Sequence, residues 1–179
     1  AESKIALRYD GRMEFDELRT VEASDESGNN YEVVVSRLAE MRVIDTNTGI
    51  ALTTQNIPYG SKLFVKNGDN GTKGQVVCEW DPFNAVIISE TDGRIEFEDV
   101  IENVTFKTDI DDATGLREKI IVESKDRNKV PSANIVDASG AVLRTYNLPV
   151  GAHLVLDNGD SIKSGHMLVK IPRAVGKAV

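Results

Sequence analysis

The architecture of the chain follows from the run Val65-Lys66-Asn67-Gly68-Asp69-Asn70-Gly71-Thr72-Lys73-Gly74-Gln75-Val76-Val77-Cys78-Glu79. In this run a strand-like segment is followed by a Gly-Asp pair, a short turn, a second glycine and another apolar segment. Gly and Asn adopt positive φ at little cost, and Asp and Asn side chains hydrogen-bond their own backbone, so this order predicts strand, turn and strand. The same G-D-x-x-x-x-G pattern recurs at 159–165, which indicates a repeated unit.

A shift of 91 positions places residues 49–79 on residues 140–170 without a gap. Eleven of these 31 pairs are identical, where chance would give about two. The identical pairs are Gly49/Gly140, Leu52/Leu143, Thr54/Thr145, Asn56/Asn147, Pro58/Pro149, Gly60/Gly151, Leu63/Leu154, Asn67/Asn158, Gly68/Gly159, Asp69/Asp160 and Gly74/Gly165. The match extends backwards with small gaps, because Val43-Ile44-Asp45 aligns with Ile135-Val136-Asp137. The sequence therefore predicts an internal duplication.

Short segments rich in β-branched and aromatic residues alternate with turn sequences in both copies. The segments expected to form strands include 31–35, 62–65, 75–78, 85–88 and 94–97. No window sustains a helical period beyond a couple of turns. The sequence thus predicts an all-β chain of two tandem modules, residues 1–105 and 106–179. In this division, the strands at 85–88 and 94–97 form a longer tail of the first module.

The balance of charges bears on the kind of partner. The 179 residues carry a formal net charge of −8, with a sequence pI of about 4.8. Proteins that grip the phosphate backbone supply Lys and Arg, so an acidic chain without a basic cluster is a poor direct ligand of nucleic acid. No segment approaches the run of about 20 apolar residues that crosses a membrane. The expected partner is therefore protein.

The start of the chain and its single cysteine bear on its origin and compartment. The start, Ala1-Glu2-Ser3-Lys4, has no Met and no apolar leader, which favours an excised fragment or a processed start. Cys78 lies in the apolar run Val76-Val77-Cys78 and has no second cysteine with which to pair. We expect a buried, inert thiol, which fits a reducing cytoplasm.

Two histidines and one acidic run are the candidates for chemistry. His153 and His166 lack the neighbouring Cys or acidic ligands of a metal site, and we expect them at strand positions. The run Asp109-Ile110-Asp111-Asp112 fails the calcium-loop pattern, because Ala113, Thr114 and Ile120 stand where an oxygen ligand, Gly and Glu are needed. The sequence therefore predicts a solvated turn there. We assign no catalytic, cofactor-binding or metal-binding residue.

The repeated turn resembles the hammerhead turn of biotinyl and lipoyl carrier domains, in which a lysine on a later hairpin carries the cofactor. No lysine occurs between Gln75 and Phe106, so only the second copy offers candidates, Lys170 and Lys177. Neither follows the usual Met-Lys context. A carrier domain is kept as the alternative function. A β-rich hydrolase also stays open, because catalytic triads assemble in space rather than in sequence.

The whole chain resembles the insertion that interrupts the trigger loop of the β′ subunit in many bacterial RNA polymerases. The most specific stretches are Pro58-Tyr59-Gly60 leading to Asn67-Gly68-Asp69, then residues 79–82 and 108–116, and Leu148-Pro149-Val150-Gly151 leading to Ile171-Pro172. The resemblance implies two tandem sandwich-barrel hybrid modules. One departure is Gly71, which stands where the turn usually carries an apolar residue; the second copy keeps Ile162. We expect this glycine to loosen the first turn.

The resemblance also implies a function without local catalysis. The parent enzyme, a nucleotidyltransferase, binds magnesium through an aspartate-rich loop of the type N-A-D-F-D-G-D, which is absent here. The implied role is a non-catalytic accessory insertion that modulates trigger-loop folding, and hence elongation, pausing and transcript cleavage. The implied partners are other β′ regions and polymerase subunits in the cytoplasm. No cofactor is expected in this fragment.

Overall fold

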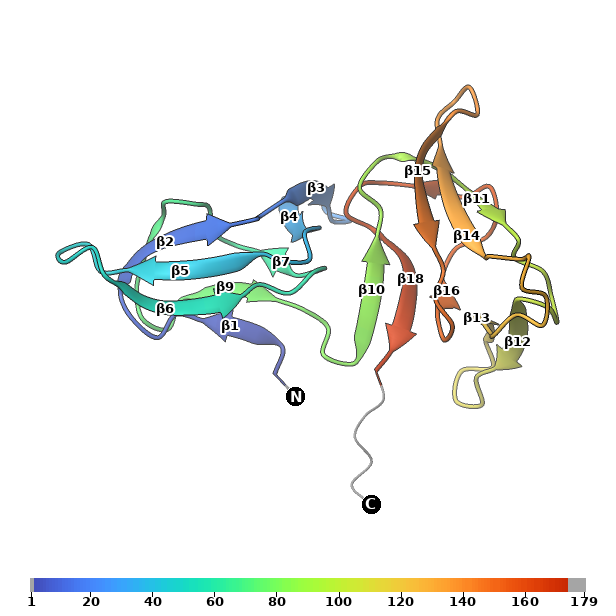
Figure 1. Cartoon of the computed structure of the whole chain (residues 1–179), viewed down its shortest axis with the longest axis horizontal. Coiled ribbons are helices and arrows are strands. Elements are labelled where there is room, and N and C mark those ends of the chain that lie inside the picture. Colours follow the sequence, from blue (N-terminus) through green and yellow to red (C-terminus); the bar gives the residue numbers. More distant parts are fainter. Residues whose placement is uncertain (1, 174–179) are drawn as a thin grey trace, which may run out of the picture. The chain divides into compact units, whose positions relative to one another are not determined.

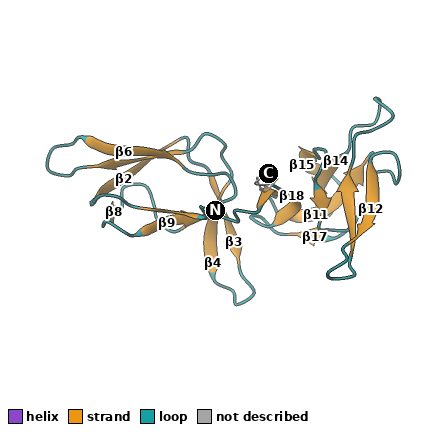
Figure 2. Cartoon of the chain, turned by 90° about the horizontal axis from the view of Figure 1, so that it is seen from below, coloured by secondary structure: helices purple, strands orange, loops and turns teal. Residues whose placement is uncertain are grey.

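The structure is a computed structural model that describes residues 2–173. Within them strands alternate with loops and no helix occurs (Figure 2), which confirms the all-β prediction. Figure 1 shows the strands gathered in two compact units, Ala1–Pro82 and Phe83–Val179. The two units are called the first and the second unit below, and each is described by itself.

The first unit is a sandwich of two antiparallel sheets, with strand orders β1-β9-β7-β4-β3 and β6-β5-β2-β8. Its strands are β1 (Lys4–Ala6), β2 (Gly11–Asp16), β3 (Thr20–Ser24), β4 (Asn30–Val34), β5 (Glu40–Ile44), β6 (Ala51–Asn56), β7 (Lys62–Leu63), β8 (Asn70–Gly71) and β9 (Val76–Glu79). Both sheets contribute to one buried cluster, which includes Met13 of β2, Val34 of β4 and Val77 of β9. Burial of these apolar side chains between the sheets is the main force that stabilises the unit.

The second unit repeats this topology strand for strand, with sheet orders β10-β18-β16-β13-β12 and β15-β14-β11-β17. Its strands are β10 (Asn84–Ile88), β11 (Gly93–Glu98), β12 (Phe106–Ile110), β13 (Arg117–Ile121), β14 (Ser132–Val136), β15 (Val142–Asn147), β16 (His153–Leu154), β17 (Ser161–Ile162) and β18 (Met167–Pro172). Ile95, Ile121 and Leu168 lie in its core. The predicted duplication is thus a duplication of a whole nine-strand module.

The predicted boundary after residue 105 is wrong, because the chain divides between Pro82 and Phe83. The strands assigned to the tail of the first module are β10 and β11 of the second unit. β10 pairs with β18, and β11 pairs with β14 and β17. They are therefore the equivalents of β1 and β2, which pair with β9 and with β5 and β8.

The match at an offset of 91, extended backwards with small gaps, did not reach the first two strands of each unit. The offset is 91 between Gly68 and Gly159 but only 82 between Gly11 and Gly93. At the smaller offset Asp10-Gly11-Arg12 matches Asp92-Gly93-Arg94, and Glu14-Phe15 matches Glu96-Phe97. This match was the signal that would have placed the boundary. Longer loops inside the second unit account for the change in offset.

The repeated turn is held by the same hydrogen bonds in both units. Asn67 accepts a bond from the backbone N–H of Phe15 at 2.8 Å, and Asn158 accepts one from Phe97 at 2.8 Å. The glycine that follows each asparagine has a φ near 90°, a conformation that other residues rarely adopt. The Asn-Gly pair therefore ties the turn to β2 in the first unit and to β11 in the second.

Gly71 does not loosen the first turn, contrary to the expectation. It is buried, and a Cβ built there would lie 2.3 Å from Cδ1 of Leu7 and 3.0 Å from Cε of Met13. In the second unit the positions of Leu7 and Gly71 are taken by Ser89 and Ile162, both buried. A large residue and a small one have exchanged sides, so the same volume is filled in both cores.

The first and last strands of each unit are hydrogen-bonded neighbours. Lys4 of β1 is paired with Glu79 of β9, and Asn84 of β10 is paired with Pro172 of β18. Each unit therefore begins and ends at the same place. A module with this property can be placed within another chain without separating the residues that flank it.

Candidate functional site

His153 lies in a charged cluster on the sheet that contains β13, β16 and β18. Its Nδ1 is 3.0 Å from Oε2 of Glu118, and the other carboxylate oxygen of Glu118 is 3.9 Å from Nζ of Lys170. No serine or cysteine is hydrogen-bonded to His153 among the contacts of the described residues. The cluster is an ion-paired patch of a sheet surface, and this arrangement lacks the nucleophile that a triad requires.

His166 lies in the turn before β18 and not on a strand, contrary to the expectation, and the acidic run spans the end of β12 and the turn that follows it. The backbone carbonyl of His166 accepts a bond from Ser89 in the turn before β18. Asp111 accepts bonds from the backbone of Ala113 at 2.8 Å and Thr114 at 3.4 Å, which closes the β12–β13 hairpin. The predicted solvated turn is therefore observed. Within residues 2–173, no group of three or more His, Cys, Asp or Glu side chains is placed to hold a metal ion.

Lys170 does not occupy a hairpin tip, where a carrier lysine is expected. It lies within β18, between Val86 of β10 and His153 of β16. Its ammonium group is directed to Glu118. The other candidate, Lys177, lies outside the described residues.

Cys78 is fully buried in the core of the first unit, as predicted. Burial raises the pKa of its thiol from the ordinary value of 9.0 to about 11, because the thiolate would lose its hydration; a hydrogen bond with Ser61 acts in the opposite direction. The thiolate is the reactive form of cysteine, so the group is inert at neutral pH.

The raised pKa predicts a loss of stability in alkali. The unfolded chain releases the Cys78 proton near pH 9, whereas the folded chain keeps it to about pH 11. The unfolded state therefore binds fewer protons between these values, and the free energy of unfolding falls as pH rises through this window, by up to about 1.4 kcal/mol per pH unit.

Urea denaturation of the wild-type chain and of Cys78→Ala at pH 8, 9, 10 and 11 measures this effect. Burial also raises the pKa of Tyr146, so only the difference between the two proteins reports on the thiol. We expect a shallower decline for Cys78→Ala. Parallel declines would contradict the prediction.

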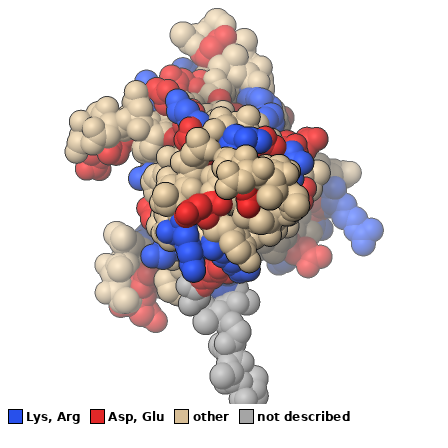
Figure 3. Space-filling view, turned by 90° about the vertical axis from the view of Figure 1, so that its left-hand side faces the viewer, with Lys and Arg blue, Asp and Glu red and all other residues tan. Residues whose placement is uncertain are grey.

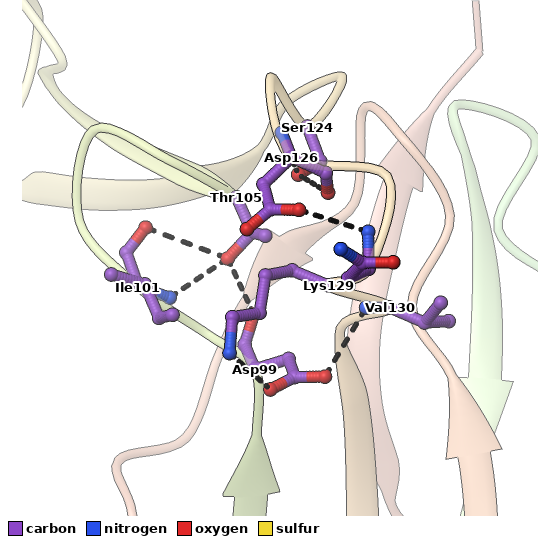
Figure 4. A network of polar contacts seen from close by, with 8 residues as sticks. Asp99, Ile101, Thr105, Ser124, Asp126, Lys129 and Val130 are labelled. Carbon is purple, nitrogen blue, oxygen red and sulfur yellow. Dashed lines mark hydrogen bonds and ion pairs between the residues drawn. The ribbon is translucent and has the colours of Figure 1, made fainter.

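The two units differ most in two loops that meet in the second unit (Figure 4). Residues 99–105 join β11 to β12, whereas the equivalent loop, 17–19, is four residues shorter. Residues 122–131 join β13 to β14, whereas 35–39 is five residues shorter. Val130 donates its backbone N–H to Oδ2 of Asp99 at 3.2 Å, and Nζ of Lys129 lies 4.0 Å from Oδ1.

Thr105 holds the first of these loops from inside. Its side chain is fully buried. The hydroxyl donates to the backbone carbonyl of Asp99 at 2.6 Å and accepts from the N–H of Ile101 at 2.8 Å. A buried hydroxyl with both roles satisfied fixes the loop's shape. The longer loop of the second unit is thus an ordered element.

Apolar side chains are exposed at equivalent positions of the two units. Three such pairs are Leu38/Val130, Leu52/Leu143 and Phe64/Val155. Figure 3 shows Lys and Arg interspersed with Asp and Glu on the face that it presents, unlike the continuous basic surface typical of nucleic-acid binders. These apolar side chains therefore recur at the same exposed positions of the repeated module.

Together, the repeated sheets define a class, a duplicated all-β module of two nine-strand units. No protein-family model matches the chain. It is 64% identical over 178 residues to the DNA-directed RNA polymerase subunit β′ of Parabacteroides distasonis and 60% identical over 178 residues to that of Phocaeicola vulgatus. The subunit β′ of Flavobacterium johnsoniae is 48% identical over 177 residues.

Each of these matches covers 99% of this chain and 12% of the relative. Over nearly its whole length, the chain corresponds to a segment of DNA-directed RNA polymerase β′ subunits. The family identified from the resemblance is thereby confirmed. Among the described residues there is no helix long and apolar enough to cross a membrane.

The sequence did not lead us to predict that the loops 99–105 and 122–131 are longer than their equivalents in the first unit. The left-handed residues Glu17 and Asp99, both with φ of 56°, occupy the same corner after β2 and β11. The match of Asp10-Gly11-Arg12 with Asp92-Gly93-Arg94 would have aligned these corners. The alignment would then have shown that the lengthened loops lie only in the second copy.

Proposed function

We propose that the chain is a non-catalytic insertion in the trigger loop of the β′ subunit, and that it modulates elongation, pausing and transcript cleavage during transcription. The observation that carries the proposal is the match of 99% of the chain to a 12% segment of β′ subunits. The adjacent first and last strands of each unit support an inserted position. The proposal assigns the segment no cofactor of its own and a cytoplasmic location.

The mechanism follows from population shift. An insertion that contacts neighbouring polymerase surfaces differently when its host loop is folded and unfolded biases that equilibrium by the difference in contact free energy. About 1–2 kcal/mol, the contribution of a few peripheral contacts, changes the ratio of the two states about 5–30-fold. The exposed apolar positions of the two units are the candidates for such contacts.

Deletion of the segment from the intact polymerase tests the proposal. We expect pause lifetimes to change by a factor within the range given above, with nucleotide addition still detectable. Removal of residues 84–172 alone is a matched variant, because Asn84 and Pro172 are paired neighbours and the flanking residues can be joined. Pause lifetimes equal to those of the wild-type enzyme in both variants would refute a regulatory role.

An inserted segment also requires its two ends to lie close together. Trp80 donates its N–H to the carbonyl of Ser3, and Arg173 donates to that of Phe83. Three peptide units join Trp80 to Phe83 and span at most about 11 Å. With about 5 Å across each hydrogen-bonded pair, Ser3 and Arg173 are at most about 21 Å apart, whatever the placement of the units.

Spin labels at Ser3→Cys and Arg173→Cys, in a Cys78→Ala background, measure this distance by electron paramagnetic resonance. We expect a distribution centred below about 30 Å once the label arms are included. The matched control places the labels at Ser27 and Thr114, on turns of different units with no such restraint. A Ser3–Arg173 distance above 40 Å would contradict the proposed insertion topology.

A further inference from the structure

The corner residue that follows β2 in the first unit has the same backbone conformation as its equivalent in the second but different partners. In the second unit the carboxylate of Asp99 receives the N–H of Val130 at 3.2 Å and lies 4.0 Å from the ammonium of Lys129 (Figure 4). The second unit therefore shows what satisfies an acid at this corner. It is a segment in which a cation precedes an apolar residue, directly after the turn that the N–H of Lys129 closes on the carbonyl of Asp126.

In the first unit the equivalent acid, Glu17, has no such partner among the described residues. Arg37 aligns with Lys129, but its guanidinium lies over the ring of Tyr59, 4.7 Å from the centroid. Within residues 2–173 no hydrogen bond or ion pair involves the carboxylate of Glu17 or of Glu40, which lie at the start and the end of this corner. The shorter loop thus leaves exposed the carboxylate of Glu17, whose equivalent the second unit neutralises from within. Glu40 adds a second exposed carboxylate where the second unit has Ser132.

A groove lies between these carboxylates. It has a volume of about 550 Å³ and is lined by Glu17, Arg37, Leu38, Glu40, Asn56, Ile57, Pro58 and Tyr59. The side chain of Leu38 is 77% exposed at its rim, and Ile57 is buried at its base. The groove therefore offers apolar contact flanked by the two carboxylates, and its lining cation, Arg37, is stacked on Tyr59.

We propose that this groove binds an extended polypeptide segment from outside the chain, in which a Lys or Arg lies next to an apolar side chain. The cation would pair with Glu17, as Lys129 pairs with Asp99, while the apolar side chain covers Leu38. Two carboxylates at the rim repel phosphate groups, so the groove does not suit nucleic acid. The partner segment would belong to the part of the β′ subunit that this chain does not match. The inference does not depend on the trigger-loop proposal.

Site-specific photo-crosslinking in the assembled polymerase tests the inference. A benzophenone amino acid replaces Leu38 in the full β′ subunit, and mass spectrometry locates the crosslinked peptide. We expect a crosslink to a polymerase peptide that contains Lys or Arg beside an apolar residue. The same amino acid at Val130, the equivalent exposed position of the second unit, is the matched control, and its yield to other polymerase peptides should be several-fold lower.

Charge reversal separates a specific groove from a merely exposed leucine. Glu17→Lys should reduce the Leu38 crosslink at least about fivefold. Glu26→Lys, which makes the same change of charge on the β3–β4 turn, should leave it unaltered. Equal effects of the two substitutions would overturn the inference. So would a crosslink from Leu38 to nucleic acid, to residues 83–179 of the chain itself, or to a peptide without a cation.

Discussion

Gly71→Ile is expected to destabilise the first unit by about 3 kcal/mol, the upper part of the range for overpacking a filled core. The new side chain has no free space, because a Cβ at this position would already lie 2.3 Å from Leu7 and 3.0 Å from Met13. Leu7→Ser in the same unit is expected to cost a similar amount, about 3 kcal/mol, through lost apolar burial. Urea denaturation of the purified chain measures both.

The double substitution should lower the free energy of unfolding by less than the sum of the two single substitutions. Ser89 and Ile162 fill the equivalent space in the second unit, where the serine hydroxyl donates to the carbonyl of Thr91 at 2.6 Å. Leu7→Ser with Gly71→Ile reproduces this pair, so we expect a favourable coupling of at least about 2 kcal/mol. If the two losses in free energy of unfolding were strictly additive, the exchange of Leu7 and Gly71 for a serine and an isoleucine would not fill the first core as it fills the second.

Gly93→Ala is expected to destabilise the second unit by about 3 kcal/mol through a clash with backbone. The added Cβ would lie 2.6 Å from the carbonyl oxygen of Val136 and 2.6 Å from Cγ2 of Ile135. That carbonyl belongs to the β11–β14 pairing, so it cannot withdraw without breaking the sheet. Gly140→Ala is the matched control, because nothing lies within 4 Å of its Cβ and only its φ of 87° is unfavourable. We expect it to cost about 1 kcal/mol.

The equivalent substitution in the first unit, Gly11→Ala, tests whether each change destabilises its own unit alone. Gly11→Ala would place a Cβ 2.6 Å from the carbonyl oxygen of Ile44. Hydrogen exchange followed by mass spectrometry should show faster exchange in β2 and β5 for Gly11→Ala, and in β11 and β14 for Gly93→Ala. Equal acceleration in both units for either variant would contradict two separate cores.

The part of the fold that depends on the chemistry of the turn residues could be predicted from the sequence. Asn67-Gly68-Asp69 and Asn158-Gly159-Asp160 reach the positive φ of a turn at little cost, and their side chains hydrogen-bond nearby backbone, so the repeated turn and the all-β class were predictable. The module boundary was not predicted, because the first two strands of the second unit share only a short match with those of the first. Strand pairing, which joins β10 to β18 across the length of the unit, decides the boundary, and in the sequence only the short match around Gly11 and Gly93 signals it.

The candidate groove could not be predicted in the same way. Glu17 and Leu38 are ordinary surface residues in the sequence, and their importance depends on what the neighbouring loop does. The loop of the second unit supplies Lys129 and Val130 to its own acid, whereas in the first unit Arg37 is held by Tyr59. Such a difference appears only when two copies of one backbone are compared in space.

The pairing of first and last strands determines how each unit would respond to a pulling force. Tension on the chain that flanks the first unit acts on Lys4 and Glu79, which lie at the same end of one antiparallel ladder. Hydrogen bonds loaded in this way open one after another, as in a zipper, instead of sharing the load in shear. Each unit can therefore begin to open at its base under modest tension. The opening reaches the core at the next pair, Ile5 with Cys78, so tension and loss of the core are linked.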